Sequence, residues 1–170
     1  MKTEGVEGLV GMCRDVLVGG VHVCCSEPCG DRECGGLVGS VWRNGGVVES
    51  GKGLWRRGRF RWVLATLDST VEKRGEWLEL AAHGVDFIRK YGFDSDGRMF
   101  FHVTRDGKPV RKRRYVFTES FAAIALAAYA KASGDDEAAV QARDLFELFI
   151  RYTTTPGLIP PKTDPATRPG

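Results

Sequence analysis

The 170-residue sequence has no long hydrophobic run and little net charge. Its longest uncharged stretch near the middle covers residues 120–130, far short of the ~20 apolar residues that a membrane-spanning helix needs. At the amino end, Glu4, Glu7, Arg14 and Asp15 interrupt any apolar core of the kind found in signal peptides. A net charge of +3 is too small to indicate nucleic-acid binding by itself. We therefore expect a cytoplasmic protein that binds neither a membrane nor nucleic acid.

Cysteine is scarce, and its spacing does not fit a zinc site. Four of the five cysteines crowd into "CCSEPCGDREC", with adjacent, four-residue and five-residue spacings. Zinc sites usually pair their cysteines as CxxC, and a second such pair is missing here. The alternative is a set of free thiols in a reducing compartment, which fits a cytoplasmic protein better. We expect no bound metal.

Glycine and proline divide the chain into three parts. Fourteen of the 22 glycines lie within residues 1–58, and no strong amphipathic stripe follows Val18. Residues 1–54 are therefore expected to be divergent or poorly packed, and residues 55–152 to form a helical core. Residues 153–170 hold five of the seven prolines and are expected to form an extended connector.

Hydrophobic periodicity predicts four helices in the core. The third of them, around residues 120–130, is apolar or small throughout, which predicts burial on all sides. Thr118 is expected to cap this helix, Gly134 to end it and Asp135 to start the next one. Helical spacing places Phe60, Leu64, Leu67 and Val71 on one face of the first helix, and Trp55, Arg59, Trp62 and Thr66 on the neighbouring face. The apolar stripe of the second helix is predicted to be Trp77, Ala81, Gly84, Ile88 and Tyr91. The inward face of the last helix is predicted to be Ala138, Ala142, Leu145, Phe149 and Tyr152.

A helix with one polar side thus alternates with a helix that is apolar all round. Two concentric layers of helices require this alternation, because inner helices touch neighbours everywhere and outer helices meet water. The run from Phe100 to Thr104 and the Asp106-Gly107 turn signal add two short strands. The fold class is therefore mainly α, with antiparallel helix pairs and short β-hairpins in the connections. Periodicity alone leaves a helical toroid and an α-solenoid open.

Two sequence motifs carry a resemblance to a known family. The segment "RGRFRW" and the stretch "EWLELAAHGVDFIRKYGFDSDGRMFFHVTRDGKPVRKRRYVFTESFAAIALAAYAKASGD" resemble the N-acylglucosamine 2-epimerase family over residues 55–169. Upstream, "DRECGGLVGSVWRNGGVV" matches the spacing of a family hairpin. Arg57 stands where relatives carry glutamine, and Cys34 stands where they commonly carry tyrosine.

The resemblance implies a partial (α/α)6 toroid, in which this chain is the N-terminal portion and residues 153–170 lead to the missing half. Members of the family isomerise sugars at C2 by moving a proton next to a carbonyl, through an enediolate and without a cofactor. Their two acid/base histidines lie in the carboxy-terminal half, beyond the end of this sequence. The resemblance therefore implies a small-molecule sugar substrate, no cofactor, no catalytic residue in this chain and no activity of the chain alone. Whether the full-length protein forms a homodimer stays an open question.

Arg59 and Glu119 are the main candidates for substrate binding that the resemblance implies. Arg59 occupies the arginine of the family's "QGR" motif, which points into the substrate funnel in relatives. The alternative is a surface arginine stacked on Trp55 or Trp62. Glu119 stands at the start of an inner helix, where it would accept hydrogen bonds from sugar hydroxyls. The alternative is an acid favoured there by the helix dipole, worth ~0.3–1 kcal/mol.

Tyr115 and Phe121 flank Glu119 and are expected to stack on a sugar ring, with a place in the core as the alternative. His83 lies on a polar helix stripe and His102 alternates with apolar neighbours, so both are expected at the surface. The basic run "DGKPVRKRRY" is expected to be a solvated hairpin, with attraction of a phosphate or nucleotide as its alternative. For the whole chain, the alternative to an epimerase fragment is a non-catalytic helical interaction module or a degenerate remnant of the family.

Overall fold

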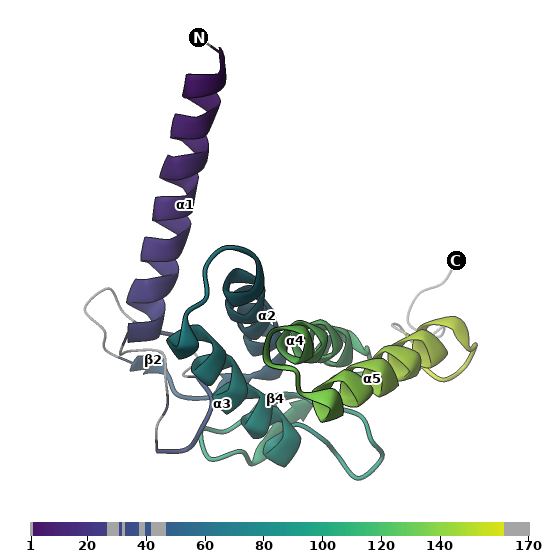
Figure 1. Cartoon of the computed structure of the whole chain (residues 1–170). Coiled ribbons are helices and arrows are strands. Elements are labelled where there is room, and N and C mark those ends of the chain that lie inside the picture. Colours follow the sequence, from purple (N-terminus) through teal and green to yellow (C-terminus); the bar gives the residue numbers. More distant parts are fainter. Residues whose placement is uncertain (1, 27–30, 32, 38–39, 42–46, 162–170) are drawn as a thin grey trace, which may run out of the picture.

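The computed structural model describes residues 2–26, 31, 33–37, 40–41 and 47–161 (Figure 1). Five helices lie in this part of the chain: α1 (Lys2–Ser26), α2 (Leu54–Thr70), α3 (Gly75–Tyr91), α4 (Phe117–Ser133) and α5 (Asp136–Thr154). Its strands are β1 (Ser40–Val41), β2 (Val47–Glu49), β3 (Lys52–Gly53), β4 (Phe100–Val103) and β5 (Pro109–Lys112). None of these helices is long and apolar enough to span a membrane.

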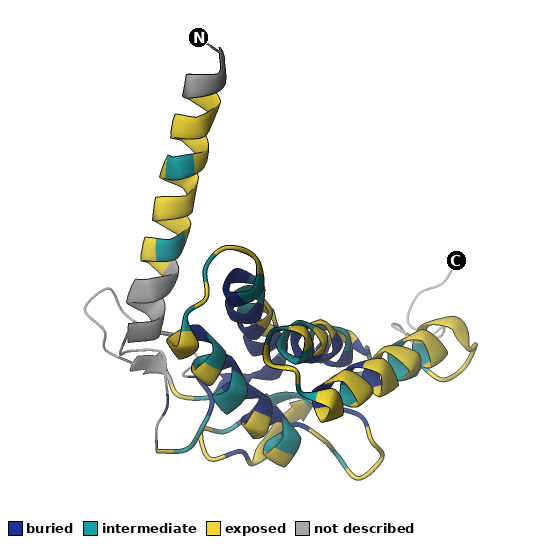
Figure 2. Cartoon of the chain, in the orientation of Figure 1, coloured by how far each residue is buried: buried dark blue, intermediate teal, exposed yellow. Residues whose placement is uncertain are grey.

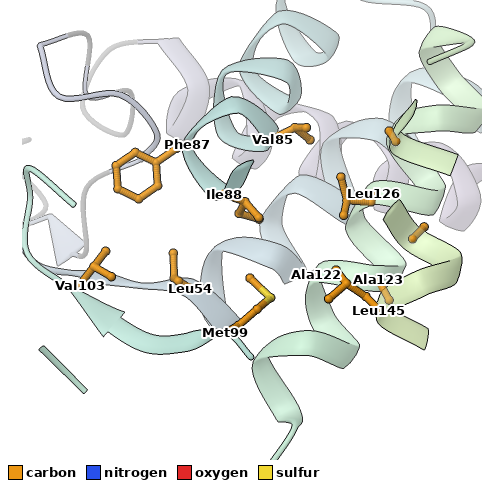
Figure 3. Close-up of a cluster of buried hydrophobic side chains, with 12 residues drawn as sticks. Leu54, Val85, Phe87, Ile88, Met99, Val103, Ala122, Ala123, Leu126 and Leu145 are labelled. Carbon is orange, nitrogen blue, oxygen red and sulfur yellow. The ribbon is translucent and has the colours of Figure 1, made fainter. Parts of the chain in front are cut away.

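The helices of the core form two layers. α2 and α4 pack against each other, α3 packs against α2, and α5 packs against α4. Figure 3 shows the main apolar cluster, in which α2, α3, α4, α5 and β4 contribute side chains. A second cluster, centred on Trp77, Leu64, Leu67 and Ala81, joins α2 to α3. The predicted arrangement of inner helices paired with outer helices is confirmed for these four elements.

The outer helices agree best with the predicted faces. In α3, four of the five predicted inward residues are buried, and Tyr91 is half-buried. In α5, Ala138, Ala142 and Leu145 are buried as predicted, whereas Phe149 and Tyr152 are half-buried. The helix boundaries follow from local chemistry. Gly134 ends α4 with a φ of +79°, and the Asp135 side chain accepts a hydrogen bond from the Ala138 amide at 2.8 Å.

The inner helices depart from the predictions. α4 is not buried on all sides, because Ile124 is 43% exposed and Phe117 is 57% exposed. Figure 2 shows exposed and half-buried positions on α4 beside the buried ones. The predicted cap at Thr118 is also wrong, since α4 begins at Phe117 after Val116 and no side chain caps it. In the region of α2, Val71 is 38% exposed because it follows the last residue of the helix.

α1 projects away from the four-helix core (Figures 1 and 2). Its contact with the core is made near α3, where Arg14 lies 3.5 Å from Glu72 and Val18 packs beside the second apolar cluster. Its other apolar side chains between residues 5 and 17 are exposed: Val6, Leu9, Val10, Met12, Val16 and Leu17. The helix therefore presents an apolar stripe that the described residues leave uncovered.

The short strands tie the amino-terminal half to the helices. β3, β4 and β5 form an antiparallel sheet, and β1 pairs with β2. The predicted hairpin between β4 and β5 is confirmed. Gly107 adopts a φ of +93° in its turn, and the Thr104 amide donates to the Lys108 carbonyl at 2.8 Å.

A buried carboxylate, Asp31, holds the segment before β1 against this sheet. Both carboxylate oxygens accept hydrogen bonds from Arg105 at 2.8 Å, and the Cys34 amide donates to Oδ1 at 3.1 Å. The Lys52 Nζ lies 3.2 Å from Oδ2, and both side chains are fully buried. Burial alone raises the pKa of the Asp31 carboxyl, but the hydrogen bonds from Arg105, Cys34 and Lys52 outweigh it and hold the pKa well below its usual range.

Two glycines make this arrangement possible. Gly35 and Gly36 have φ values of +79° and +71°, and a Cβ on Gly36 would lie 3.1 Å from the Phe87 ring. The Lys52 ammonium donates to the Gly35 carbonyl and lies 4.2 Å from the centroid of the Phe87 ring. Residues 33–36 therefore form a tight turn beside a buried ion pair.

We predict that Asp31→Asn lowers the free energy of unfolding at pH 7 by about 3–5 kcal/mol, because Lys52 would be buried without its counter-charge. The pKa of Asp31 is depressed, so its contribution is fully present above the ordinary aspartate pKa of 3.8 and is lost as the pH falls below that value. Urea unfolding measures the difference in free energy of unfolding between Asp31→Asn and the native sequence. This difference should stay constant from pH 7 down to pH 3.8 and become smaller between pH 3.8 and pH 2.5.

Asp144→Asn is the matched control, because it makes the same chemical change on an exposed position of α5. It should alter stability by no more than about 0.5 kcal/mol. Equal stabilities of Asp31→Asn and the native sequence at pH 7 would show that the buried pair does not stabilise the fold.

Candidate functional site

Three aromatic rings from different elements form one connected surface, which we call the aromatic platform: Trp55 of α2, Phe101 of β4 and Phe121 of α4. The centroids of Trp55 and Phe101 are 6.0 Å apart with planes 15° from parallel. The centroids of Trp55 and Phe121 are 6.1 Å apart at 46°. All three residues are half-buried, so part of each side chain is exposed to solvent.

Arg59 lies over this platform. Its Cζ is 5.9 Å from the Trp55 centroid and 5.7 Å from the Phe121 centroid, within range of a cation–π interaction. Arg59 is exposed, and within the described part of the chain its guanidinium forms no hydrogen bond or ion pair. The structure thus brings together two predicted site residues, Arg59 and Phe121, and also shows the predicted alternative of stacking on Trp55. Both interpretations are compatible, because the N–H donors stay available to a ligand.

Gly58 explains why these residues meet. A Cβ at this position would lie 2.8 Å from the Phe121 carbonyl oxygen and 3.1 Å from the Phe121 Cβ. α2 and α4 therefore approach each other closely one residue before Arg59. This close approach places the first turns of the two helices side by side and sets the distance between Arg59 and Phe121.

Glu119 is fully buried and already engaged. Its Oε1 accepts hydrogen bonds from Arg98 Nε at 2.6 Å and from the Met99 amide at 3.0 Å. Its Oε2 has no hydrogen-bond partner among the described residues. This environment differs from both alternatives given for Glu119. The side chain is not exposed, and it has a buried cationic partner in addition to the helix dipole. Contact between Glu119 and a substrate stays a prediction.

Arg98, the partner of Glu119, was missed by sequence reasoning. Its Nη2 donates to the carbonyls of Arg113 at 3.2 Å and Tyr115 at 3.1 Å, and its Cζ lies 4.6 Å from the Tyr152 centroid. The available signal was a charged residue two positions before the apolar strand that begins at Phe100. Arg98 therefore orders the segment between β5 and α4.

Tyr115, the fourth predicted residue, is half-buried on this same segment. Its hydroxyl accepts a hydrogen bond from Arg114, and its ring lies 5.5 Å from that of Phe117. No ring contact joins Tyr115 to the platform among the residues that the structure describes. A place for Tyr115 beside the sugar stays a prediction.

His83 and His102 were predicted to lie at the surface, but both are half-buried. The His83 Nε2 lies 3.2 Å from the Asp31 carbonyl oxygen. His102 lies against Gly51, and the pairing of β4 with β5 is irregular on both sides of His102. The described residues also hold no group of three or more histidine, cysteine, aspartate or glutamate side chains suited to a metal ion.

We predict that Gly58→Ala lowers the free energy of unfolding by about 1–3 kcal/mol, because the added methyl group overlaps the Phe121 backbone. Gly75→Ala is the matched control, since nothing lies within 4 Å of a Cβ at that position. The control should change stability by less than about 1 kcal/mol. Thermal unfolding followed by circular dichroism measures both, and equal effects would contradict a close contact at Gly58.

Comparison with known proteins places this geometry in context. The model of the N-acylglucosamine 2-epimerase (GlcNAc 2-epimerase) family matches residues 36–160. Human N-acylglucosamine 2-epimerase is 28% identical over 126 residues, which are 72% of this chain and 30% of the relative. A cellobiose 2-epimerase of Ruminococcus albus is 32% identical over 97 residues, which are 56% of this chain and 25% of the relative. The chain therefore spans about a third or less of the length of these relatives.

Solved structures agree with the arrangement of helices. The sugar epimerase from a ruminal bacterium matches with a TM-score of 0.65 at 30% identity, over 74% of this chain and 32% of that one. The cellobiose 2-epimerase of Spirochaeta thermophila matches with a TM-score of 0.69 at 26% identity, over 83% and 36%. These neighbours are (α/α)6 toroids, and the described helices form part of such a toroid. The family match covers well over half of the chain, and the chain belongs to the N-acylglucosamine 2-epimerase family.

Proposed function

We propose that this chain supplies the arginine-and-aromatic part of a carbohydrate site in a sugar 2-epimerase. The whole enzyme would remove a proton from C2 of an aldose or N-acyl-hexosamine and return it on the other face. The observation that carries the proposal is the position of Arg59 over Trp55 and Phe121. Ligand sites combine such apolar aromatic surfaces with a few fixed polar groups, and a sugar offers both an apolar face and hydroxyls.

Arg59 has two roles in this proposal. Its guanidinium donates hydrogen bonds to sugar oxygens in the ground state. As the C2 proton leaves, negative charge builds on the neighbouring oxygen, and a permanent cation stabilises the enediolate more than the neutral sugar. Packing against Trp55 and Phe121 limits the guanidinium orientations, so little reorganisation is needed during the reaction.

Proton transfer itself belongs outside this chain. An acid or base must lie within hydrogen-bond reach of the substrate. His83 is close to the Asp31 carbonyl, and His102 lies against Gly51. Neither position supports a role at the platform, and the curated relatives are about three times as long as the matched region. We therefore propose binding without catalysis for the isolated chain.

We predict that the 170-residue chain binds N-acetylglucosamine weakly and does not exchange its C2 proton. Arg59→Ala should weaken binding by about tenfold, equivalent to about 1.4 kcal/mol. Chemical shifts of the sugar measure binding, and incubation in deuterated water followed by NMR measures exchange at C2.

Arg143→Ala is the matched control, because it removes an exposed arginine from α5, which packs on α4 away from the platform. It should bind the sugar as the native sequence does. Deuterium at C2 in the presence of the native chain would contradict the absence of catalysis, and equal effects of the two variants would contradict the role of Arg59.

A second candidate function is a non-catalytic interaction module. The exposed side of α4 favours it, since Phe117 and Ile124 present a large apolar area beside half-buried Phe121. Apolar surface of this kind usually finds a partner or causes association. A homodimer would be one way to cover it.

If this surface drives association, light scattering coupled to size-exclusion chromatography should show a dimer or larger species that grows with concentration. Ile124→Glu should restore the monomer, because a charge at the centre of the apolar side opposes its burial. Val140→Glu, an equivalent change at an exposed position of α5, should leave the association unchanged. A monomer at all concentrations would argue against the interaction module.

A further inference from the structure

We infer that the aromatic platform takes an anionic sugar, one that carries a phosphate or carboxylate group, and that Arg113 recognises this group. The inference rests on the proposed sugar-binding function and names its substrate class. Arg113 is exposed, and its Cζ lies 4.6 Å from the centroid of the Phe101 ring.

The two arginines flank a continuous set of rings. The Arg113 guanidinium lies over the Phe101 ring, and Phe101 stacks on Trp55 with centroids 6.0 Å apart. Trp55 in turn contacts Arg59 and Phe121. One guanidinium therefore lies over the Trp55–Phe121 part of the platform and the other over the Phe101 part. The proposal places the sugar against these rings, with Arg59 on the Trp55–Phe121 part and Arg113 on the Phe101 part.

Three other cations in or beside β4 and β5 each have a carboxylate partner. The Lys112 Nζ lies 2.7 Å from Asp94 and 2.6 Å from Asp96. Arg98 pairs with Glu119 at 2.6 Å. Arg105 pairs with Asp31 at 2.8 Å.

Arg59 and Arg113 form no ion pair or hydrogen bond through their side chains within the described ranges of the chain. Two uncompensated positive charges at one accessible aromatic surface create a local potential that favours an anion. The interaction with an aromatic ring does not neutralise a guanidinium, and it leaves the N–H groups at its edge available.

The backbone of Arg113 is held in place although its side chain is exposed. Its carbonyl accepts a hydrogen bond from Arg98 Nη2 at 3.2 Å, and Arg98 is fixed by buried Glu119. Ligand binding would therefore restrict only the side-chain torsions of Arg113, because its backbone is already held in place. Its two parallel N–H groups match two oxygens of a phosphate or carboxylate, a geometry that a single sugar hydroxyl does not use.

The test compares ligands that differ in charge, measured by isothermal titration calorimetry on the complete 170-residue chain at low salt. The ligands are N-acetylglucosamine, N-acetylglucosamine 6-phosphate, glucuronate and inorganic phosphate. We expect at least one of the anionic sugars to bind about tenfold tighter than N-acetylglucosamine. The preferred anion distinguishes a phosphorylated sugar from a sugar acid.

Arg113→Gln should remove most of this preference, and Arg113→Lys should restore part of it because the charge returns without the two-pronged geometry. Arg143→Gln lowers the net charge equally at a position on α5 and should keep the preference. Circular dichroism melting curves establish that each variant is folded.

Four other results would each contradict a specific part of the proposals. Equal affinity for neutral and anionic sugars, with a loss on Arg59→Ala, would refute the anionic class and leave the proposed sugar site standing. Inorganic phosphate binding as tightly as the phosphorylated sugar would show an anion site that does not recognise the sugar. A preference that survives Arg113→Gln would remove Arg113 from the site, and no binding of any sugar would refute both proposals.

Discussion

The buried pair of Arg98 and Glu119 is the interaction on which the candidate site depends. A guanidinium and a carboxylate that are both removed from water stabilise a structure only when their remaining hydrogen-bonding groups are satisfied. Here Arg98 also donates to the carbonyls of Arg113 and Tyr115, and Glu119 Oε1 also accepts from the Met99 amide, whereas Oε2 has no hydrogen-bond partner among the described residues. One pair therefore joins the start of β4, the segment after β5 and the first turn of α4, and these elements supply or adjoin Phe101, Arg113 and Phe121, whereas Trp55 and Arg59 come from α2.

Sequence periodicity predicted the outer helices well and the inner helices only in part. A polar side facing water is a local property, so the faces of α3 and α5 followed from their own residues. Burial of an apolar helix depends on what surrounds it, which explains the exposed Ile124 on α4. Capping at Thr118 failed because the segment before α4 is held by Arg98, a contact that no local pattern encodes.

The same distinction applies to the site. Arg59 and Phe121 were predicted from a family resemblance, and the structure brings them together through the close contact at Gly58. Phe101 and Arg113 were not predicted to join them, because 42 residues separate Phe101 from Arg59 and only the pairing of β3 with β4 brings them close. Glu119 was singled out as an acid at a helix start, and its buried partner 21 residues earlier changes what it does.

α2 places two arginines in different environments: Arg59 is exposed beside the platform, and Arg61 is buried at the contact with α3. Arg61 is fully buried against Gly84 of α3, and its Nε and both Nη atoms lack hydrogen-bond partners among the described residues. Burial, and then the nearby charge of Arg57, lower the pKa of Arg61 to about 9, still high enough for a charged side chain at neutral pH. A charge without a partner in a core opposes folding. Because Arg59 lies two residues earlier, about 200° around the helix, this cost falls on the α2–α3 contact and leaves the platform side unaffected.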